Sequence, residues 1–261
     1  MSVEGRRILI IGAGVNGSVC AAELRKAGYN VIVLARGQRF EELKERGIEV
    51  EDPLKNTRSV TRVPVIDHLE PDDLYEYILV VVRKNQVLGL LPVLAQNRSP
   101  SVVFMVNTAS GHEDWVRALG APRVMLSFAF AGGRREGSLI RAMRSRRGST
   151  PFGEIDGKTT DRLTSLVRIL NRAGLHAKAT VNMPDWLATH AAMVVPLAML
   201  ILQHGCDTAA LARSREDLNL LAKAMRETLS VLRSLGRRIV PPVWPFSGFS
   251  LDLLSCVSFA H

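Results

Sequence analysis

The sequence feature that most restricts the fold is the glycine pattern of residues 12–17, "GAGVNG", which has the spacing G-x-G-x-x-G. An apolar run, residues 8–11, comes directly before it, and a helical pattern over residues 15–27 follows and ends at Gly28. This order of strand, glycine turn and helix is the context in which the spacing indicates a dinucleotide site. The alternative is an ordinary glycine turn.

Each glycine of the pattern has an expected physical role. Gly12 permits the tight turn, Gly14 lets a pyrophosphate approach the backbone, and Gly17 allows the helix to pack closely on the strand. The start of the helix adds backbone amides and a favourable dipole for an anion. We therefore expect the cofactor to contact the whole turn: Gly12, Ala13, Gly14, Val15, Asn16 and Gly17.

The order of apolar runs and helical patterns predicts an α/β fold. Short aliphatic strands alternate with amphipathic helices up to residue 181, as in a Rossmann-type parallel sheet covered on both faces. From residue 182 onward only helices are expected, over residues 183–204 and 216–235. We thus predict an NADP-binding Rossmann-type domain at 1–181. An all-helical substrate and dimerisation domain, short or truncated, is expected at 182–261.

Two arginines near the end of the second strand favour NADP over NAD. An NAD-binding chain usually has Asp or Glu at that point to hold the ribose hydroxyls. Here the sequence is "LARGQR", with Arg36 and Arg39 and no acid before Glu41. A guanidinium can bind a 2′-phosphate with two hydrogen bonds, whereas a carboxylate would repel it. Arg39 is equally compatible with a charge on a helix surface.

Polar residues also end two other buried strands. "ILVVVR" ends in Arg83, followed by Lys84, and "VVFMVN" ends in Asn107. In an open α/β sheet, ligands bind beyond the carboxyl ends of the strands, so these groups are expected to face cofactor phosphates or an acidic substrate. The alternative is that Arg83 and Lys84 point into solvent.

The distribution of charge, the cysteines and the apolar runs limit the possible partners and the cellular location of the protein. The net charge of +9 is densest in the arginine-rich residues 132–149, which suit a solvated surface, the rim of an anion site or a nucleic-acid patch. No aromatic residue is interleaved there, so we do not expect nucleic acid as a partner. Three widely spaced cysteines predict free thiols and a cytoplasmic location. The longest apolar run, residues 191–202, is too short to cross a bilayer.

Over roughly residues 7–200 the chain resembles the ketopantoate reductase (2-dehydropantoate 2-reductase) family. The likeness lies in the order of "GAGVNG", "LAR", "VRKNQV", "VVFMVN", "ALGAPRVMLSFAFAGG", "FGEIDGKTTDR" and "DWLATH…VP". The resemblance implies an NADPH-binding Rossmann domain, a helical C-terminal domain and hydride transfer to the ketone of a small 2-keto acid in pantothenate biosynthesis. We also expect a homodimer and, from the short apolar runs, no membrane partner.

The resemblance assigns roles to individual residues. Arg36 matches the arginine that binds the 2′-phosphate, Gln86 the glutamine of the K-x-x-Q motif, and Asn107 the asparagine of the N-G motif. Arg83 stands where that first motif usually has lysine, and Thr108 where N-G has glycine. Arginine still binds phosphate or carboxylate, but it does not release a proton near neutral pH.

The chain departs from the family where the proton donor is expected. Ala188 occupies the position of the family's lysine, two residues after Trp186, and Ala192 occupies that of an asparagine. Positions 188, 192, 195 and 199 share one helix face, which the sequence predicts to be a packing face. His190 is a chemically suitable acid, but it lies about 200° around the helix from Ala188. It is a catalytic candidate beside Asn107; a structural role near Trp186 is the alternative, and His112 is a weaker candidate.

Two functions therefore remain open at this stage. The first is an NADPH-dependent 2-keto acid reductase that obtains its proton from solvent, from His190 or from another group. The second is a catalytically impaired NADP-binding paralogue or sensor. The closing segment after "RRIVPP" does not resemble that of the family, and we expect a truncated or altered end there.

Overall fold

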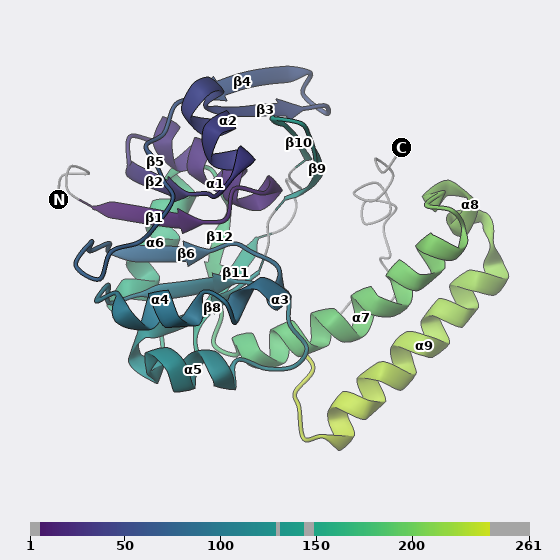
Figure 1. Ribbon diagram of the computed structural model, residues 1–261. Helices are drawn as coiled ribbons and strands as arrows, with labels where there is room; N and C mark the ends of the chain where they lie inside the picture. Colours follow the sequence, from purple (N-terminus) through teal and green to yellow (C-terminus); the bar gives the residue numbers. More distant parts are fainter. Residues whose placement is uncertain (1–5, 129–130, 144–148, 241–261) are drawn as a thin grey trace. The chain divides into compact units, whose positions relative to one another are not determined.

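Short aliphatic runs form an eight-stranded main sheet in the computed structural model, which describes residues 6–128, 131–143 and 149–240 (Figure 1). Its order is β12-β11-β8-β7-β6-β1-β2-β5. The bounds are β1 Arg7–Ile11, β2 Asn30–Leu34, β5 Val65–Ile66, β6 Tyr77–Val80, β7 Val102–Met105, β8 Val124–Ser127, β11 Thr150–Glu154 and β12 Ala177–Ala179. The six strands from β8 to β5 are parallel, whereas β11 is antiparallel to β8.

Helices cover both faces of the main sheet because alternate strand residues point to opposite sides. Ile8 and Ile10 share a core with Cys20 of α1 (Val15–Lys26) and Leu166 of α6 (Asp161–Arg172). On the other face, Phe104 stacks on Trp115 of α5 (Glu113–Leu119), with ring centroids 4.3 Å apart. The sheet reverses its direction of growth at β1, which lies between β2 and β6. The expected Rossmann-type α/β fold is confirmed.

A second sheet has the strand order β4-β3-β10-β9. Its strands β3 (Ile48–Asp52) and β4 (Thr57–Thr61) are antiparallel neighbours, and the sequence does not predict the other two strands, β9 (Gly132–Glu136) and β10 (Leu139–Met143). They form an antiparallel hairpin whose β10 runs parallel to β3. Part of the arginine-rich segment is thus an ordered wall, and Ile140 and Ala142 pack against Val19 of α1.

Two short helices follow β6, α3 (Lys84–Val87) and α4 (Leu91–Gln96). Pro92 lies at the start of α4. Proline has no amide N–H and its ring clashes with the preceding turn, so it suits a helix start and not an interior. The helix α2 (Gln38–Arg46) follows β2.

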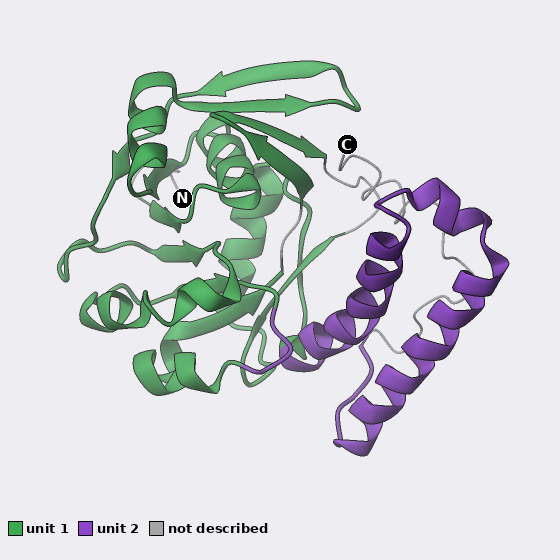
Figure 2. Cartoon of the chain, turned by 45° about the vertical axis from the view of Figure 1, so that its right-hand side comes forward, with its two compact units in different colours: residues 1–107, 112–183 green, residues 108–111, 184–261 purple. Residues whose placement is uncertain are grey.

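The chain divides into two compact units, residues 1–107 with 112–183 and residues 184–261 with 108–111 (Figure 2). The described part of the second unit is helical: α7 (Met183–Gln203), α8 (Thr208–Arg213) and α9 (Arg215–Ser234). Its core joins Met193 and Leu197 of α7 to Leu221 and Met225 of α9. The helix α8 was not predicted. The closing segment expected to be altered, after "RRIVPP", lies outside the described residues.

The helix α7 is long and apolar enough, by length and composition, to cross a membrane. The expectation that no span exists rested on a shorter apolar run within it. Its first turn, however, carries the buried Asp185, which accepts a hydrogen bond from the backbone N–H of Arg238 and pairs with the Arg237 side chain. One face of α7 packs against α9 in the core of the second unit. Both features are typical of the core helix of a folded unit.

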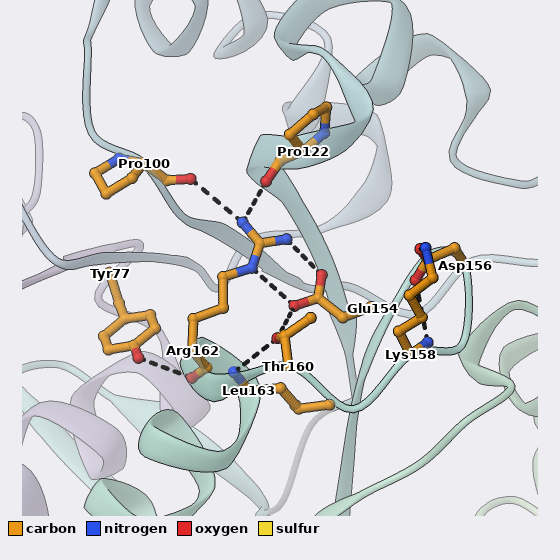
Figure 3. Close-up of polar contacts among 9 residues, drawn as sticks. All are labelled: Tyr77, Pro100, Pro122, Glu154, Asp156, Lys158, Thr160, Arg162 and Leu163. Atoms are coloured by element: carbon orange, nitrogen blue, oxygen red, sulfur yellow. Dashed lines mark hydrogen bonds and ion pairs between the residues drawn. The ribbon is translucent and has the colours of Figure 1, made fainter.

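A buried ion pair fixes the connection between β11 and α6 (Figure 3). The Glu154 carboxylate is 4% exposed and accepts two hydrogen bonds from Arg162, one of them 2.7 Å long. It also accepts one from the Thr160 hydroxyl, which itself caps α6. The Arg162 guanidinium reaches the backbone carbonyls of Pro100 and Pro122 as well. The "FGEIDGKTTDR" motif thereby has a structural explanation.

Replacing Glu154 with glutamine should destabilise the fold, because it leaves the Arg162 charge with no buried counter-charge. Removing one partner of a buried pair costs about 3 to 5 kcal/mol, and we expect a loss near the lower value from urea unfolding. The matched control is Asp156→Asn, which breaks an exposed pair with Lys158 in the same loop. Equal stability of the two variants would contradict the structural role of Glu154.

Candidate functional site

The glycine turn has the tight geometry that the sequence predicts. Gly12 has a φ of +105°, and a Cβ at that position would lie 2.3 Å from the Val81 carbonyl oxygen. A Cβ on Gly17 would lie only 1.8 Å from the Gly12 carbonyl oxygen, so α1 meets the turn too closely for any other residue. A Cβ on Gly14, in contrast, would meet no protein atom within 4 Å. The surface of the turn is therefore open at Gly14.

This open surface belongs to a cavity of about 1240 Å³ at the carboxyl ends of the central strands. The wall includes Ile11, Leu34 and Met105, from the ends of β1, β2 and β7. Six cationic side chains also line it: Arg36, Arg39, Arg83, Lys84, Arg134 and Arg135. None of the described residues that line the cavity is acidic. Its size and charge suit a large ligand with several negative charges.

Three of the predicted ligand groups are exposed in this cavity: Arg36, Arg83 and Asn107. Neither the Arg36 nor the Arg83 side chain makes a hydrogen bond or an ion pair with a described residue. Asn107 is also exposed in the wall, two residues beyond the end of β7. The structure therefore brings Arg36, Arg83 and Asn107 to one cavity, as the rule for parallel strand ends predicts.

Three other residues at the cavity have local structural roles. The Gln86 side-chain oxygen accepts a hydrogen bond from the backbone N–H of Arg83, at 3.1 Å, and so closes the first turn of α3. The Asn16 side-chain oxygen accepts one from the Ala131 backbone N–H, at 2.8 Å. The Lys84 ammonium lies 4.6 Å from the centre of the Trp115 ring, a cation–π contact, instead of pointing into solvent.

Arg39 holds the glycine turn in place. It is 9% exposed, so the interpretation as a helix-surface charge is wrong. Its guanidinium donates to the carbonyls of Ala13 and Ser138, to the Ser18 hydroxyl and to the Glu42 carboxylate, at 3.0 to 3.2 Å. Burial lowers the pKa of this guanidinium, although arginine remains protonated. These contacts tie the turn to α2 and to the β9–β10 hairpin.

The second unit contains the position of the expected proton donor. Ala188 and Ala192 are half-buried, but Val195 and Met199 are 58% and 63% exposed. The prediction that this face of α7 packs is therefore wrong for its second half, as far as the described residues show.

His190 stacks on Trp186, with ring centroids 5.2 Å apart. Burial lowers the pKa of the His190 imidazole to about 4. A group with this pKa is neutral at pH 7 and has no proton ready to donate, which argues against an acid role. His112, the other histidine considered, lies at the start of α5.

Together, the doubly covered parallel sheet, the glycine turn and the cation-lined cavity define a Rossmann-type protein with a dinucleotide-sized site. The family model "Ketopantoate reductase PanE/ApbA" matches residues 8–157. The chain belongs to the ketopantoate reductase family.

The chain is also similar to individual members of known sequence or structure. It is 28% identical over 174 residues to the 2-dehydropantoate 2-reductase of Archaeoglobus fulgidus, a match that covers 67% of this chain and 56% of the relative. The chain thus matches little more than half the length of that curated relative.

Among solved structures, the 2-dehydropantoate 2-reductase of Geobacter metallireducens GS-15 has a TM-score of 0.79 at 18% identity, covering 97% of this chain and 82% of the other. D-mandelate dehydrogenase with NADH and anilino(oxo)acetate has a TM-score of 0.77 at 16% identity, covering 97% and 78%. At these low identities, the two similarities show that the fold is shared.

Gly14→Ala and Gly17→Ala should differ in their effect on stability: only Gly17→Ala should destabilise the fold. The methyl group of the Gly14→Ala variant projects into open space, so the melting temperature should hardly change, while binding of a nicotinamide dinucleotide should weaken because the methyl group occupies the turn surface. The Gly17 methyl group must displace the Gly12 carbonyl, so the melting temperature should fall by several degrees. Thermal melts and NADPH fluorescence titrations measure both effects. Unchanged NADPH affinity in a folded Gly14→Ala protein would contradict the site.

Acidification should destabilise the protein partly through His190. Its folded pKa of about 4 lies below the ordinary value of 6.5, so the unfolded chain takes up the proton first as the pH falls. This contribution to stability is complete above pH 6.5 and is lost on going down to about pH 4. Urea unfolding of His190→Gln should show a smaller loss over that interval than wild type does. Identical pH slopes would mean that His190 is not buried as a neutral group.

Proposed function

We propose that the chain is an NADPH-dependent reductase of a small 2-keto acid, similar to 2-dehydropantoate 2-reductase. The observation that carries the proposal is the single cavity that contains the open glycine turn, Arg36 and Asn107, in a chain of the ketopantoate reductase family. Because the chain matches only part of the length of its curated relatives, the complete activity remains a proposal.

The residues present fit NADPH. A pyrophosphate needs backbone amides without a side chain in the way, and Gly14 leaves that space open beside the start of α1. The exposed Arg36 guanidinium, just beyond β2, can bind a 2′-phosphate with two hydrogen bonds. The exposed Arg83 lines the same cavity. The absence of acids among the described lining residues favours a ligand with three phosphate groups.

The cofactor, when bound, supplies a hydride for the ketone carbon. The side chains of the first unit bind and orient the reactants. Asn107, at the end of β7, can hold a carbonyl or carboxamide oxygen through its N–H groups. Arg83 can pair with the carboxylate of a 2-keto acid, because guanidinium binds such groups at any physiological pH. Neither Arg83 nor Asn107 can deliver the proton that the product alkoxide requires.

The missing proton donor supports a second candidate function, a catalytically impaired NADP-binding protein. Ala188 has no ionisable group, and the neutral His190 does not replace one. Loss of a positioned general acid typically costs about 10² to 10⁴ in rate. On the first candidate function, solvent supplies the proton and turnover is slow; on the second, NADPH binds without turnover.

A cytoplasmic location and a homodimer belong to the same proposal. Among the described residues Cys20 and Cys206 are free, as expected in a reducing compartment. Burial raises the pKa of the Cys20 thiol to about 12, so this thiol is unreactive. Gel filtration with light scattering measures the assembly directly.

Introducing lysine at position 188 should restore fast turnover. NADPH oxidation with ketopantoate should be slow or undetectable in wild type and rise by about 10² or more in Ala188→Lys, because an ammonium can then protonate the product oxygen. NADPH affinity should stay unchanged. The matched control is Ala198→Lys, which adds the same charge to an exposed position of α7.

Three outcomes separate the candidates. Turnover by wild type supports the reductase with a different proton source. NADPH binding without turnover, with activity gained only in Ala188→Lys, supports the impaired paralogue. A wild type that binds neither NADPH nor NADH would contradict both candidates.

A further inference from the structure

Arg135, on β9 of the second sheet, faces the glycine turn. It pairs with Ile140 of β10, and residues directly opposite each other in an antiparallel pair lie on the same face. Ile140 packs against Val15 and Val19 of α1, so this is the face that covers the start of that helix. Arg134 also lines the cavity, but as the next residue along the strand its side chain leaves β9 on the opposite face, where it pairs with Glu136 at 2.5 Å.

The charge of Arg135 is only partly compensated. Its guanidinium lies 3.7 Å from a Glu42 carboxylate oxygen, but the same oxygen is 3.0 Å from Arg39. Arg39 is the closer and more buried partner, since its side chain is 10% exposed against 45% for Arg135. One carboxylate thus serves two guanidinium groups. Arg135 makes no hydrogen bond with a described residue and lines the same cavity as Gly14 and Arg36.

The neighbours of Arg135 identify the part of the ligand that it would meet. Glu42 belongs to α2, which begins just after Arg36 at the end of β2. In a Rossmann-type site, the adenosine ribose is bound near the end of the second strand, whereas the pyrophosphate lies on the glycine turn. Arg135 therefore approaches the ribose end of the cavity from the second sheet, while Arg36 approaches it from the main sheet.

We infer that Arg135 is a second ligand of the cofactor 2′-phosphate and that, with Arg36, it selects NADP over NAD. The inference rests on the proposed NADPH site. A phosphate monoester carries nearly two negative charges at pH 7 and has three acceptor oxygens, more than one guanidinium satisfies. The β9–β10 hairpin supplies the second cation. Part of the arginine-rich segment is thereby explained as the rim of an anion site.

The test compares NADPH with NADH, which lacks only the 2′-phosphate. Fluorescence titrations of the full chain would use wild type, Arg135→Gln and Arg58→Gln. Arg58 is the matched control, because it lies on β4 of the same sheet, pairs with Glu49 and does not line the cavity. Wild type should bind NADPH more tightly than NADH, and Arg58→Gln should behave like wild type.

Arg135→Gln should weaken NADPH binding about tenfold or more and leave NADH binding within about twofold, because only the charged hydrogen bonds to the 2′-phosphate are lost. Arg135→Lys should retain part of the preference, since it keeps the charge but not the planar fork. Equal weakening of NADPH and NADH, or no weakening, would overturn the inference while leaving the proposed cofactor intact. A wild type without preference for NADPH would instead contradict the proposed cofactor itself.

Discussion

The close approach of Gly17 to the Gly12 carbonyl is the constraint on which the rest of the first unit depends. It fixes where α1 starts and how closely the helix lies on the main sheet. With α1 in that position, its outer side offers Val15 and Val19 to the second sheet, and its first turn faces the cavity. Arg39 then fastens the turn by donating to the Ala13 carbonyl. Two missing Cβ atoms and one buried guanidinium thus shape the cavity wall.

Much of this arrangement could be predicted from the sequence, because it follows from local rules. The glycine spacing and the aliphatic runs gave the order of strands and helices. The rule that parallel strands end at one edge brought Arg36, Arg83 and Asn107 together. The two-unit organisation also agrees with the change from alternating strands and helices to helices alone, although the roles of the units stay a prediction.

What could not be predicted depends on contacts between distant segments. The strands β9 and β10 could not be recognised in the sequence because they contain few apolar residues. Their partner strand β3 lies some ninety residues earlier in the chain, so no local pattern reveals the pairing. Arg39 looked like a surface charge, since only the fold brings the carbonyls of Ala13 and Ser138 to its guanidinium. One local signal for the hairpin was present: Gly137, which has a φ of +57°, lies in the turn between β9 and β10.

The parallel pairing of β10 with β3 also has a consequence for the order in which the protein forms. During synthesis, the glycine turn, α1 and β3 leave the ribosome long before β10 does. Until then Val15, Val19 and Val50 lack the partners that later cover them, and the cavity lacks one wall. The nascent first unit must therefore pass through a stage with an exposed apolar edge and an incomplete cavity. Exposed apolar edges of this kind make folding intermediates prone to aggregate, so closure of the second sheet also protects the nascent unit.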